Sequence, residues 1–290
     1  MSIQDFEIYL KEKLTPALIV LEKARRKKLC WVFWSSVIFI LFCYIIAINI
    51  KLDGKTLGPI IFTAILPYLL ITEKYKISIQ KKVMNIFTQY FDNLTFVEGE
   101  CIPDFKLAKS KLFNFSKNYS QACFCGEENK QKTTIALTKL WIYDEQTNKR
   151  EITFDGIVAV SLTEKFYPNQ IIITNNAQTE TFADLPRIKD TNLCVFSDNE
   201  NVAKSILTDE FTKWFLSIKE TFQSEKYIVT IFENTILCAI YKEKIKPFEY
   251  KSIFQKIYFC KKMEQMYKFI SKLLEVNYFQ FPTAQIDDNQ

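Results

Sequence analysis

The sequence of 290 residues contains no histidine. Without an imidazole side chain, the protein can form no Ser-His-Asp triad, no Cys-His dyad and no histidine metal site. Glycine is also scarce, with 5 residues in the whole chain, and neither GxGxxG nor GxxxxGK(S/T) occurs. These absences exclude histidine-dependent enzymes and nucleotide chemistry through those phosphate-binding motifs. An enzyme of this sequence would have to use carboxylates, lysine, tyrosine or cysteine.

The 8 cysteines are scattered along the chain and form no CxxC pair. This is not the framework of a secreted disulfide-rich protein, and reduced thiols that fill core space are the simpler interpretation. The formal net charge is only +5, and the positive excess gathers beside two apolar runs instead of forming a stripe along one helix. The sequence therefore predicts no nucleic-acid partner, and we expect no cofactor.

Two apolar runs near the N-terminus contain no charged side chain. Residues 29–50 form the first, and at about 1.5 Å rise per residue a helix of this length crosses the roughly 30 Å hydrocarbon core of a bilayer. Residues 56–72 form a shorter run with Pro59 in its first turn and Pro67 inside it, where a kink is expected. We expect a transmembrane hairpin over residues 29–72. A re-entrant second segment is the alternative.

Basic residues flank this hairpin at its outer ends. The connection between the two runs holds only Lys51 and Lys55 against Asp53. Because basic residues near helix ends stay in the cytoplasm, we expect both termini inside and the short connection outside. The same residues could attract anionic lipid headgroups, at about 1 kcal/mol per charge near the surface. The flanking residues are Lys23, Arg25, Arg26, Lys27, Lys28, Lys74, Lys76, Lys81 and Lys82.

The segments on either side of the hairpin show helical periodicity. In residues 1–28, apolar side chains recur every three or four positions, which predicts an amphipathic cytoplasmic helix. Its apolar stripe could meet the bilayer, a partner or the rest of this chain, and docking within the chain is favoured. Residues 73–118 are expected to form a helical connector, with the strongest helical repeat from Ile79 to Leu94 and one short helix after it.

The pattern of residues 119–281 predicts an α+β cytoplasmic domain with a mainly antiparallel sheet and packed helices. Alternating segments before and after Asn148, with "NQIIITNN" and "NLCVFSD", are expected strands. Residues 198–222 predict one helix, and "KYIVTIFENTILCAIYKE" predicts a hairpin that turns at Glu233 and Asn234. A last amphipathic helix carries Met263 and Leu274. Residues 282–290 are expected to be a flexible tail.

The order of several segments resembles the DUF3137 family of uncharacterised bacterial membrane proteins. After the apolar hairpin come "FDNLTF", "SKLFN", "FDGIVAVSLTEKF", "VFSDNENVAKSILTDEF" and "IFENTILCAIY", and the resemblance covers roughly residues 5–276. It implies a multi-pass protein of the bacterial inner membrane with a cytoplasmic domain, and a membrane-protein partner of the LemA type. It implies no catalytic residue. The acidic "GEENKQK" departs from the glycine-richer loop of the family.

Cys123 and Cys125 are the only close thiol pair in the sequence. Thiolates bind zinc, but a tetrahedral site here would need distant cysteines such as Cys101 and Cys194 to converge on the pair. In a strand, both thiols of the pair would point to the same face, which suits a packed core equally well. We therefore expect no metal site.

Neighbouring carboxylates occur at Glu127 and Glu128, and again at Asp198 and Glu200. Such pairs can perform acid-base chemistry or bind a divalent cation when a cleft perturbs their pKa values. The simpler interpretation places Glu127 and Glu128 in a solvated turn, and makes Asp198 or Asn199 the N-cap of the following helix, with Asp198 preferred.

The sequence thus favours a non-enzymatic, membrane-anchored interaction module that binds a protein partner or lipid headgroups. The alternative is an enzyme that acts on a membrane-associated substrate, and it would need a deep polar pocket holding at least two of Cys125, Glu127, Glu128 and Asp198. Transport is disfavoured, because two apolar helices without an internal charge offer no ion path unless they oligomerise.

Overall fold

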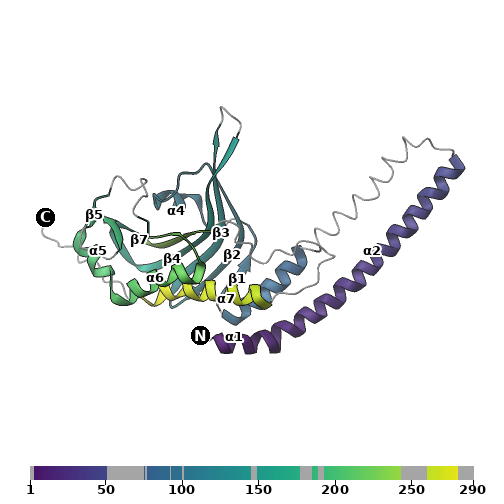
Figure 1. Ribbon diagram of the computed structural model, residues 1–290, viewed down its shortest axis with the longest axis horizontal. Coiled ribbons are helices and arrows are strands. Elements are labelled where there is room, and N and C mark those ends of the chain that lie inside the picture. The colour runs from purple at the N-terminus through teal and green to yellow at the C-terminus, as the bar shows by residue number, and fades with distance from the viewer. Residues whose placement is uncertain are drawn as a thin grey trace. The chain divides into compact units, whose positions relative to one another are not determined.

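The computed structural model describes residues 3–50, 75, 77–91, 93–99, 101–144, 149–176, 185–188, 193–242 and 260–279. Its fold is α+β, with a long apolar helix near the N-terminus and an antiparallel sheet with helices (Figure 1). Two compact units divide the chain, one mainly from residues before Phe91 and one from the sheet domain. The expected second membrane run, 56–72, and the tail, 282–290, lie outside the described residues.

One continuous helix opens the first unit. α1 (Ile3–Tyr9) continues through a π-helical turn, η1 (Leu10–Leu14), into α2 (Thr15–Ile50). The wider turn comes just before Pro16, whose nitrogen has no hydrogen to donate to the preceding turn. Thr15 directs both its backbone N–H and its hydroxyl to the carbonyl of Leu10, the hydroxyl at 2.8 Å. The expected amphipathic helix and the first apolar run are therefore one element.

The apolar stripe at the start of this helix packs on a second helix, residues 77–88, of the same unit. The ring of Phe6 meets that of Phe87 edge-on, with centroids 5.9 Å apart. The hydroxyl of Tyr9 donates a hydrogen bond of 2.5 Å to the carbonyl of Ile86. The stripe thus docks within the chain. Its buried residues, spaced one helical turn apart, are Phe6, Leu10, Leu14 and Leu18.

Seven described strands form one sheet in the second unit, and every pairing is antiparallel. Their order is β1-β2-β3-β4-β6-β5, and β7 also pairs with β4. The predicted antiparallel sheet is thereby confirmed. The strands are β1 (Leu94–Val97), β2 (Lys117–Glu128), β3 (Gln131–Asp144), β4 (Lys149–Thr174), β5 (Arg187–Ile188), β6 (Cys194–Ser197) and β7 (Lys226–Tyr241).

Two expectations about the strands were wrong. Residues 169–176 do not begin a new strand, because most of them form the end of β4. The chain also does not reverse at Glu233 and Asn234, since Ile231 and Ile236 on either side of them both pair with β4. Glu233 has a φ of 50°, and it lies where the register between β4 and β7 shifts. The irregularity is a bulge within one long strand, and not a turn.

The described helices of the sheet domain cover both faces of β7 (Figure 1). Ile228 of β7 belongs to the apolar core cluster that includes Leu107 of α4. Its neighbour Tyr227 points the opposite way, and its ring centroid lies 4.8 Å from that of Phe215 of α6. Both faces of β7 are thus buried, which agrees with its almost continuously apolar sequence. The helices are α4 (Asp104–Lys109), α5 (Glu200–Ile206), α6 (Asp209–Phe222) and α7 (Cys260–Leu274).

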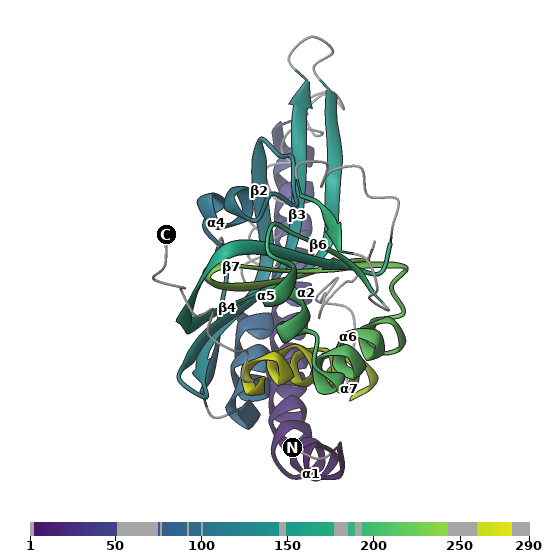
Figure 2. The same ribbon diagram turned by 90° about the vertical axis from the view of Figure 1, so that its left-hand side faces the viewer.

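The last two of these helices lie side by side (Figure 2). The indole Nε1 of Trp214 in α6 donates a hydrogen bond of 2.9 Å to the carbonyl of Lys272 in α7. The rings of Phe222 and Phe269 stack with centroids 4.4 Å apart. The apolar residues predicted on one face of the last helix, from Met263 to Leu274, are buried. This helix pair is the main cover of its face of the sheet.

Residues 198–222 were predicted as one helix, and the structure divides them. α5 ends at Ile206 and α6 begins at Asp209. The hydroxyl of Thr208 accepts a hydrogen bond of 3.2 Å from the backbone N–H of Phe211, which caps α6. A second N-cap inside the predicted helix thus starts a new helix and lets α6 take its own direction over the sheet.

Candidate functional site: the membrane anchor

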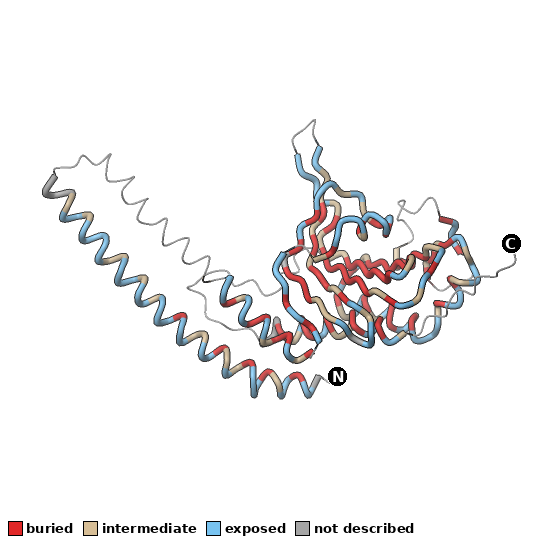
Figure 3. Tube along the Cα trace, turned by 180° about the vertical axis from the view of Figure 1, so that it is seen from behind, coloured by how far each residue is buried: buried red, intermediate tan, exposed pale blue. Residues whose placement is uncertain are grey.

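The middle of α2 is mostly exposed and carries many apolar side chains (Figure 3). Trp31 is 71% exposed and Ile38 is 64% exposed. Within the described residues, Gln4–Ile46 is the one helix long and apolar enough to cross a membrane, and none of its apolar window is buried. Other exposed apolar residues of this segment are Phe33, Trp34, Phe39, Ile40, Leu41, Phe42, Tyr44 and Ile45. In water this surface would be strongly unfavourable, so the helix suits a bilayer.

The N-terminal end of this apolar segment has the composition of a bilayer interface. Lys27 and Lys28 are exposed, and Trp31 and Trp34 follow them within two helical turns. Tryptophan rings favour the headgroup level, and basic residues at the end of a membrane helix stay at the cytoplasmic surface. The Lys28 ammonium also lies 4.2 Å from the centroid of the Tyr75 ring. Basic and aromatic side chains thus mark one border of the apolar run.

Arg25 behaves differently from the other predicted flanking residues. It is only 5% exposed. Its Nε and Nη2 donate hydrogen bonds of 2.8 Å and 2.6 Å to the two carboxylate oxygens of Glu22. Arg26 donates a further bond of 3.0 Å to the same carboxylate. Arg25 is therefore held inside the first unit, while Lys23, Arg26, Lys27, Lys28, Lys81 and Lys82 are exposed; Lys74 and Lys76 lie outside the described residues.

The structure brings Cys101 next to Cys123 and Cys125. The thiols of Cys101 and Cys123 both donate to the carbonyl of Gly99, at 3.5 Å and 3.0 Å. Burial, with a contribution from the neighbouring Cys101 thiol, raises the pKa of Cys125 to about 11. Burial likewise raises the pKa of Cys123 well above its ordinary value. Thiols in this state are poor nucleophiles and fit the packed core of the sheet.

The fourth thiol that a zinc site would need does not join this cluster. Cys194 lies on β6, where its sulfur accepts a hydrogen bond of 3.6 Å from Arg187. β6 and β2 are separated in the sheet by β3 and β4. Within the described part of the chain, no group of three or more cysteine or acidic residues is arranged to hold a metal ion.

The candidate carboxylates belong to two separate parts of the sheet. Glu127 and Glu128 end β2, just before a turn in which Asn129 and Lys130 both have positive φ. This is the backbone of a tight hairpin, and Glu127 is exposed. Asp198 is also exposed and follows β6, which β3 and β4 separate from β2 in the sheet. The fold therefore does not bring Glu127 and Asp198 into one pocket.

Asp198 was the preferred N-cap of the helix that follows it, and this was wrong. The side chain of Asn199 caps α5, because its Oδ1 accepts a hydrogen bond of 3.1 Å from the backbone N–H of Val202. The cap lies one residue after the predicted one. The backbone N–H of Asn199 donates a hydrogen bond of 3.2 Å to the hydroxyl of Ser197, the last residue of β6. Both residue types cap helices well, so the sequence alone could not separate them.

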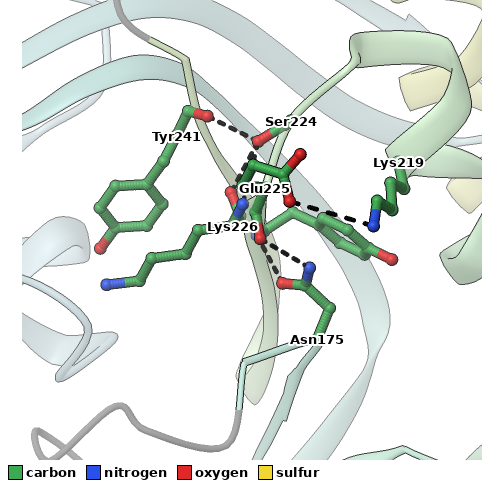
Figure 4. A network of polar contacts seen from close by, with 7 residues as sticks. Asn175, Lys219, Ser224, Glu225, Lys226 and Tyr241 are labelled. Atoms are coloured by element: carbon green, nitrogen blue, oxygen red, sulfur yellow. Dashed lines mark hydrogen bonds and ion pairs between the residues drawn. The ribbon is translucent and has the colours of Figure 1, made fainter.

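A network of polar contacts joins α6, the end of β4 and both ends of β7 (Figure 4). The Asn175 side chain accepts from the N–H of Tyr227 at 2.9 Å and donates to the carbonyl of Glu225 at 2.9 Å. The Ser224 hydroxyl lies 2.6 Å from the carbonyl of Tyr241. The Lys226 ammonium lies 4.2 Å from the centroid of the Tyr241 ring. These contacts satisfy backbone groups where α6 enters β7, so they serve the fold.

Sequence reasoning did not identify this network. The two side chains that make its hydrogen bonds come from distant segments, Asn175 after β4 and Ser224 after α6. The one local signal is the polar "QSEK" that follows the apolar face of α6. It indicates a turn, but it does not indicate which distant side chain completes the hydrogen bonds.

No family model and no curated protein matches the sequence. Among solved structures, the crystal structure of the mycobacterial trehalose monomycolate transport factor A, TtfA, is similar over 68% of this chain and 95% of that chain. The sequence identity is 9% and the TM-score is 0.34. A likeness at this level shows neither a shared family nor a shared activity.

Proposed function

We propose that this protein is a membrane-anchored interaction module whose α+β domain binds a membrane-protein partner or lipid headgroups at the inner face of a bacterial membrane. The observation that carries the proposal is the uncovered apolar surface of α2 from Trp31 to Ile45. At about 25 cal/mol for each Å² of apolar surface, such a helix is strongly stabilised when lipid replaces water. The anchor holds the attached domain at the membrane.

The proposed topology is a hairpin over residues 29–72 with both termini in the cytoplasm. Its support is the distribution of charge along the sequence. Lysine and arginine gather before the first apolar run and after the second, while the connection holds only Lys51 and Lys55 against Asp53. The positive-inside rule then places the connection outside and the α+β domain inside. In this topology the domain cysteines lie in a reducing compartment, which suits their unpaired state.

The proposed partner class rests on the resemblance to the DUF3137 family. Membership of that family would place the chain among bacterial inner-membrane proteins and beside a membrane protein of the LemA type. In-cell crosslinking of the full chain, followed by purification and mass spectrometry, tests this partner against a control that carries only residues 1–76. A membrane protein captured by the full chain and not by the anchor alone supports the interaction module.

Two measurements test the anchor and its topology. The full chain should stay in the membrane pellet after alkaline carbonate extraction, and release into the supernatant would overturn the anchor. An impermeant thiol reagent added to intact cells should label a cysteine introduced at Asp53 and should miss Cys194. Labelling of Cys194 with equal efficiency in intact and lysed cells would overturn the cytoplasmic position of the domain.

A further inference from the structure

One end of the sheet carries an exposed face of aromatic and basic side chains. The register pairs Trp141 of β3 with Lys117 of β2 and with Ile152 of β4. It also pairs Tyr143 with Arg150. Side chains of directly paired residues lie on the same face of a sheet. We call this face the outer patch, and it consists of Lys117, Tyr119, Trp141, Tyr143, Arg150 and Ile152.

The outer patch is exposed apart from Trp141, which is half-buried, although the strands beneath it are firmly held. Tyr119 is 50% exposed and Ile152 is 57% exposed. On the opposite face of the same strands, Leu140 and Phe154 are fully buried in the core of the domain. The rings of Tyr119 and Trp141 contact each other with centroids 6.3 Å apart. The patch is therefore a fixed surface of the sheet, and a ligand would bind it without having to order the backbone.

The charge of the outer patch is positive. Lys117 and Arg150 are both exposed on it. The neighbouring Lys139 is neutralised, because its ammonium lies 2.8 Å from the carboxylate of Asp155. Two positive charges beside three aromatic rings match a ligand with anionic groups above an apolar layer.

Anionic phospholipid has this chemistry. Tyrosine and tryptophan place an apolar ring and a polar tip at the level of the headgroups, and lysine and arginine reach the phosphates above them. The chain itself uses the same combination at the border of α2, where Lys27 and Lys28 precede Trp31 and Trp34. A domain tethered to a bilayer also meets headgroups at a high effective concentration, which suits a weak site.

We infer that the outer patch binds anionic phospholipid headgroups of the membrane in which α2 is anchored. The inference rests on the proposed function, because it requires the anchor, and it names the class of ligand for the attached domain. Tyr119, Trp141 and Tyr143 insert at the headgroup level, while Lys117 and Arg150 bind the phosphates. The binding surface is thus the sheet itself.

A photo-crosslinking experiment tests this inference on the full chain. Tyr143 is replaced by benzoylphenylalanine, and the protein is reconstituted into nanodiscs of phosphatidylcholine with or without phosphatidylglycerol. After irradiation, mass spectrometry measures lipid adducts. We expect more adduct with phosphatidylglycerol, and a loss of about fivefold for each charge removed in the variants K117Q, R150Q and K117Q/R150Q. The matched control places the same probe at Phe166, an exposed aromatic residue of β4 outside the patch.

The possible outcomes separate this inference from the proposed function. A chain that does not insert into nanodiscs overturns the anchor and the inference together. If the chain inserts but the probe at position 143 gives no more lipid adduct than the probe at 166, the inference alone fails. It also fails if K117Q/R150Q leaves the adduct unchanged, or if irradiation in native membranes joins position 143 to an acidic protein and not to lipid.

Discussion

Two helices of this protein carry similar apolar residues and expose them in opposite ways. In α6, one face is buried against β7 and α7, while Leu216 on the other face is 51% exposed. In α2, most of the large apolar side chains from Trp31 to Ile45 are exposed, and none of the apolar window is buried. The buried residues of α6 are Phe211, Trp214, Phe215, Ile218 and Phe222.

The difference shows that spacing, more than the amount of apolar surface, decides what a helix binds. A stripe at three- and four-residue intervals fits a single flat surface such as the sheet. An apolar surface on all sides needs a surrounding apolar medium, which the proposed bilayer supplies. Substitutions at matched positions in the two helices test this contrast.

The largest expected effect comes from charges in α2. In the variant I38R/F42R, each arginine near the centre of a membrane helix costs about 2.5–3.5 kcal/mol of insertion free energy. We expect the protein to lose its attachment, measured as the fraction left in the pellet after carbonate extraction. Leu216→Arg on the exposed face of α6 is the control and should pellet like the wild type. Equal pelleting of all three proteins would show that attachment does not depend on the apolar surface of α2.

The next effect concerns the buried face of α6. Phe215→Ala removes a ring that is fully buried against Tyr227, and should lower the free energy of unfolding by about 3–5 kcal/mol. Thermal unfolding of the full chain in detergent, followed by circular dichroism, measures the change. Leu216→Ala, one residue further along, should change it by less than about 0.5 kcal/mol. Similar losses in both variants would contradict the one-sided burial of α6.

A smaller effect concerns the break between α5 and α6. Thr208→Ala removes the hydroxyl that caps α6 and should cost about 1 kcal/mol of unfolding free energy. Thr208→Ser keeps the acceptor oxygen and should recover most of that loss in the same unfolding measurement. If serine is no better than alanine, the capping hydrogen bond does not stabilise the start of the helix.

A further effect separates the sheet domain from α2 by pH. Burial raises the pKa of Cys125 from 9.0 to about 11, so the folded domain holds this proton more tightly than the unfolded chain. The resulting stability is complete below pH 9 and is lost as the pH rises toward 11. We expect unfolding free energy to fall across this window, and to fall less in Cys125→Ala. Retention of α2 in the membrane pellet should not change over the same range, because it depends on apolar contacts.

Some of the molecule follows from local pattern alone. The charge-free run beginning at residue 29 was predicted as a helix, and so were the amphipathic repeats that contain Phe6, Phe215 and Leu273. The alternation on both sides of Asn148 predicted β3 and β4. In each case the signal lies within one segment, because a helical face or a strand face repeats every few residues.

Other features depended on residues far apart in the sequence. β1 lies inside the predicted helical connector, and it is a strand because it pairs with β2 some thirty residues later, with Phe96 opposite Phe124. β7 was predicted as a hairpin because Glu233 and Asn234 are turn formers, but its pairing with β4 keeps the chain extended. Cys101 follows β1, and it comes close to Cys123 and Cys125 because β1 pairs with β2. Contacts of this kind override local preference.

The sequence by itself determined that this chain has an apolar helix bordered by basic residues, that it lacks histidine chemistry, and that an α+β domain follows. Composition and periodicity are sufficient for these conclusions, because they reflect how each segment meets water or lipid. Only the tertiary structure decided where the few glycines are needed. At Gly156, an added Cβ would lie 2.0 Å from the carbonyl oxygen of Ile240 in β7, so only glycine lets the two strands approach. It also decided which exposed side chains form the outer patch, because strand register places distant residues on one face.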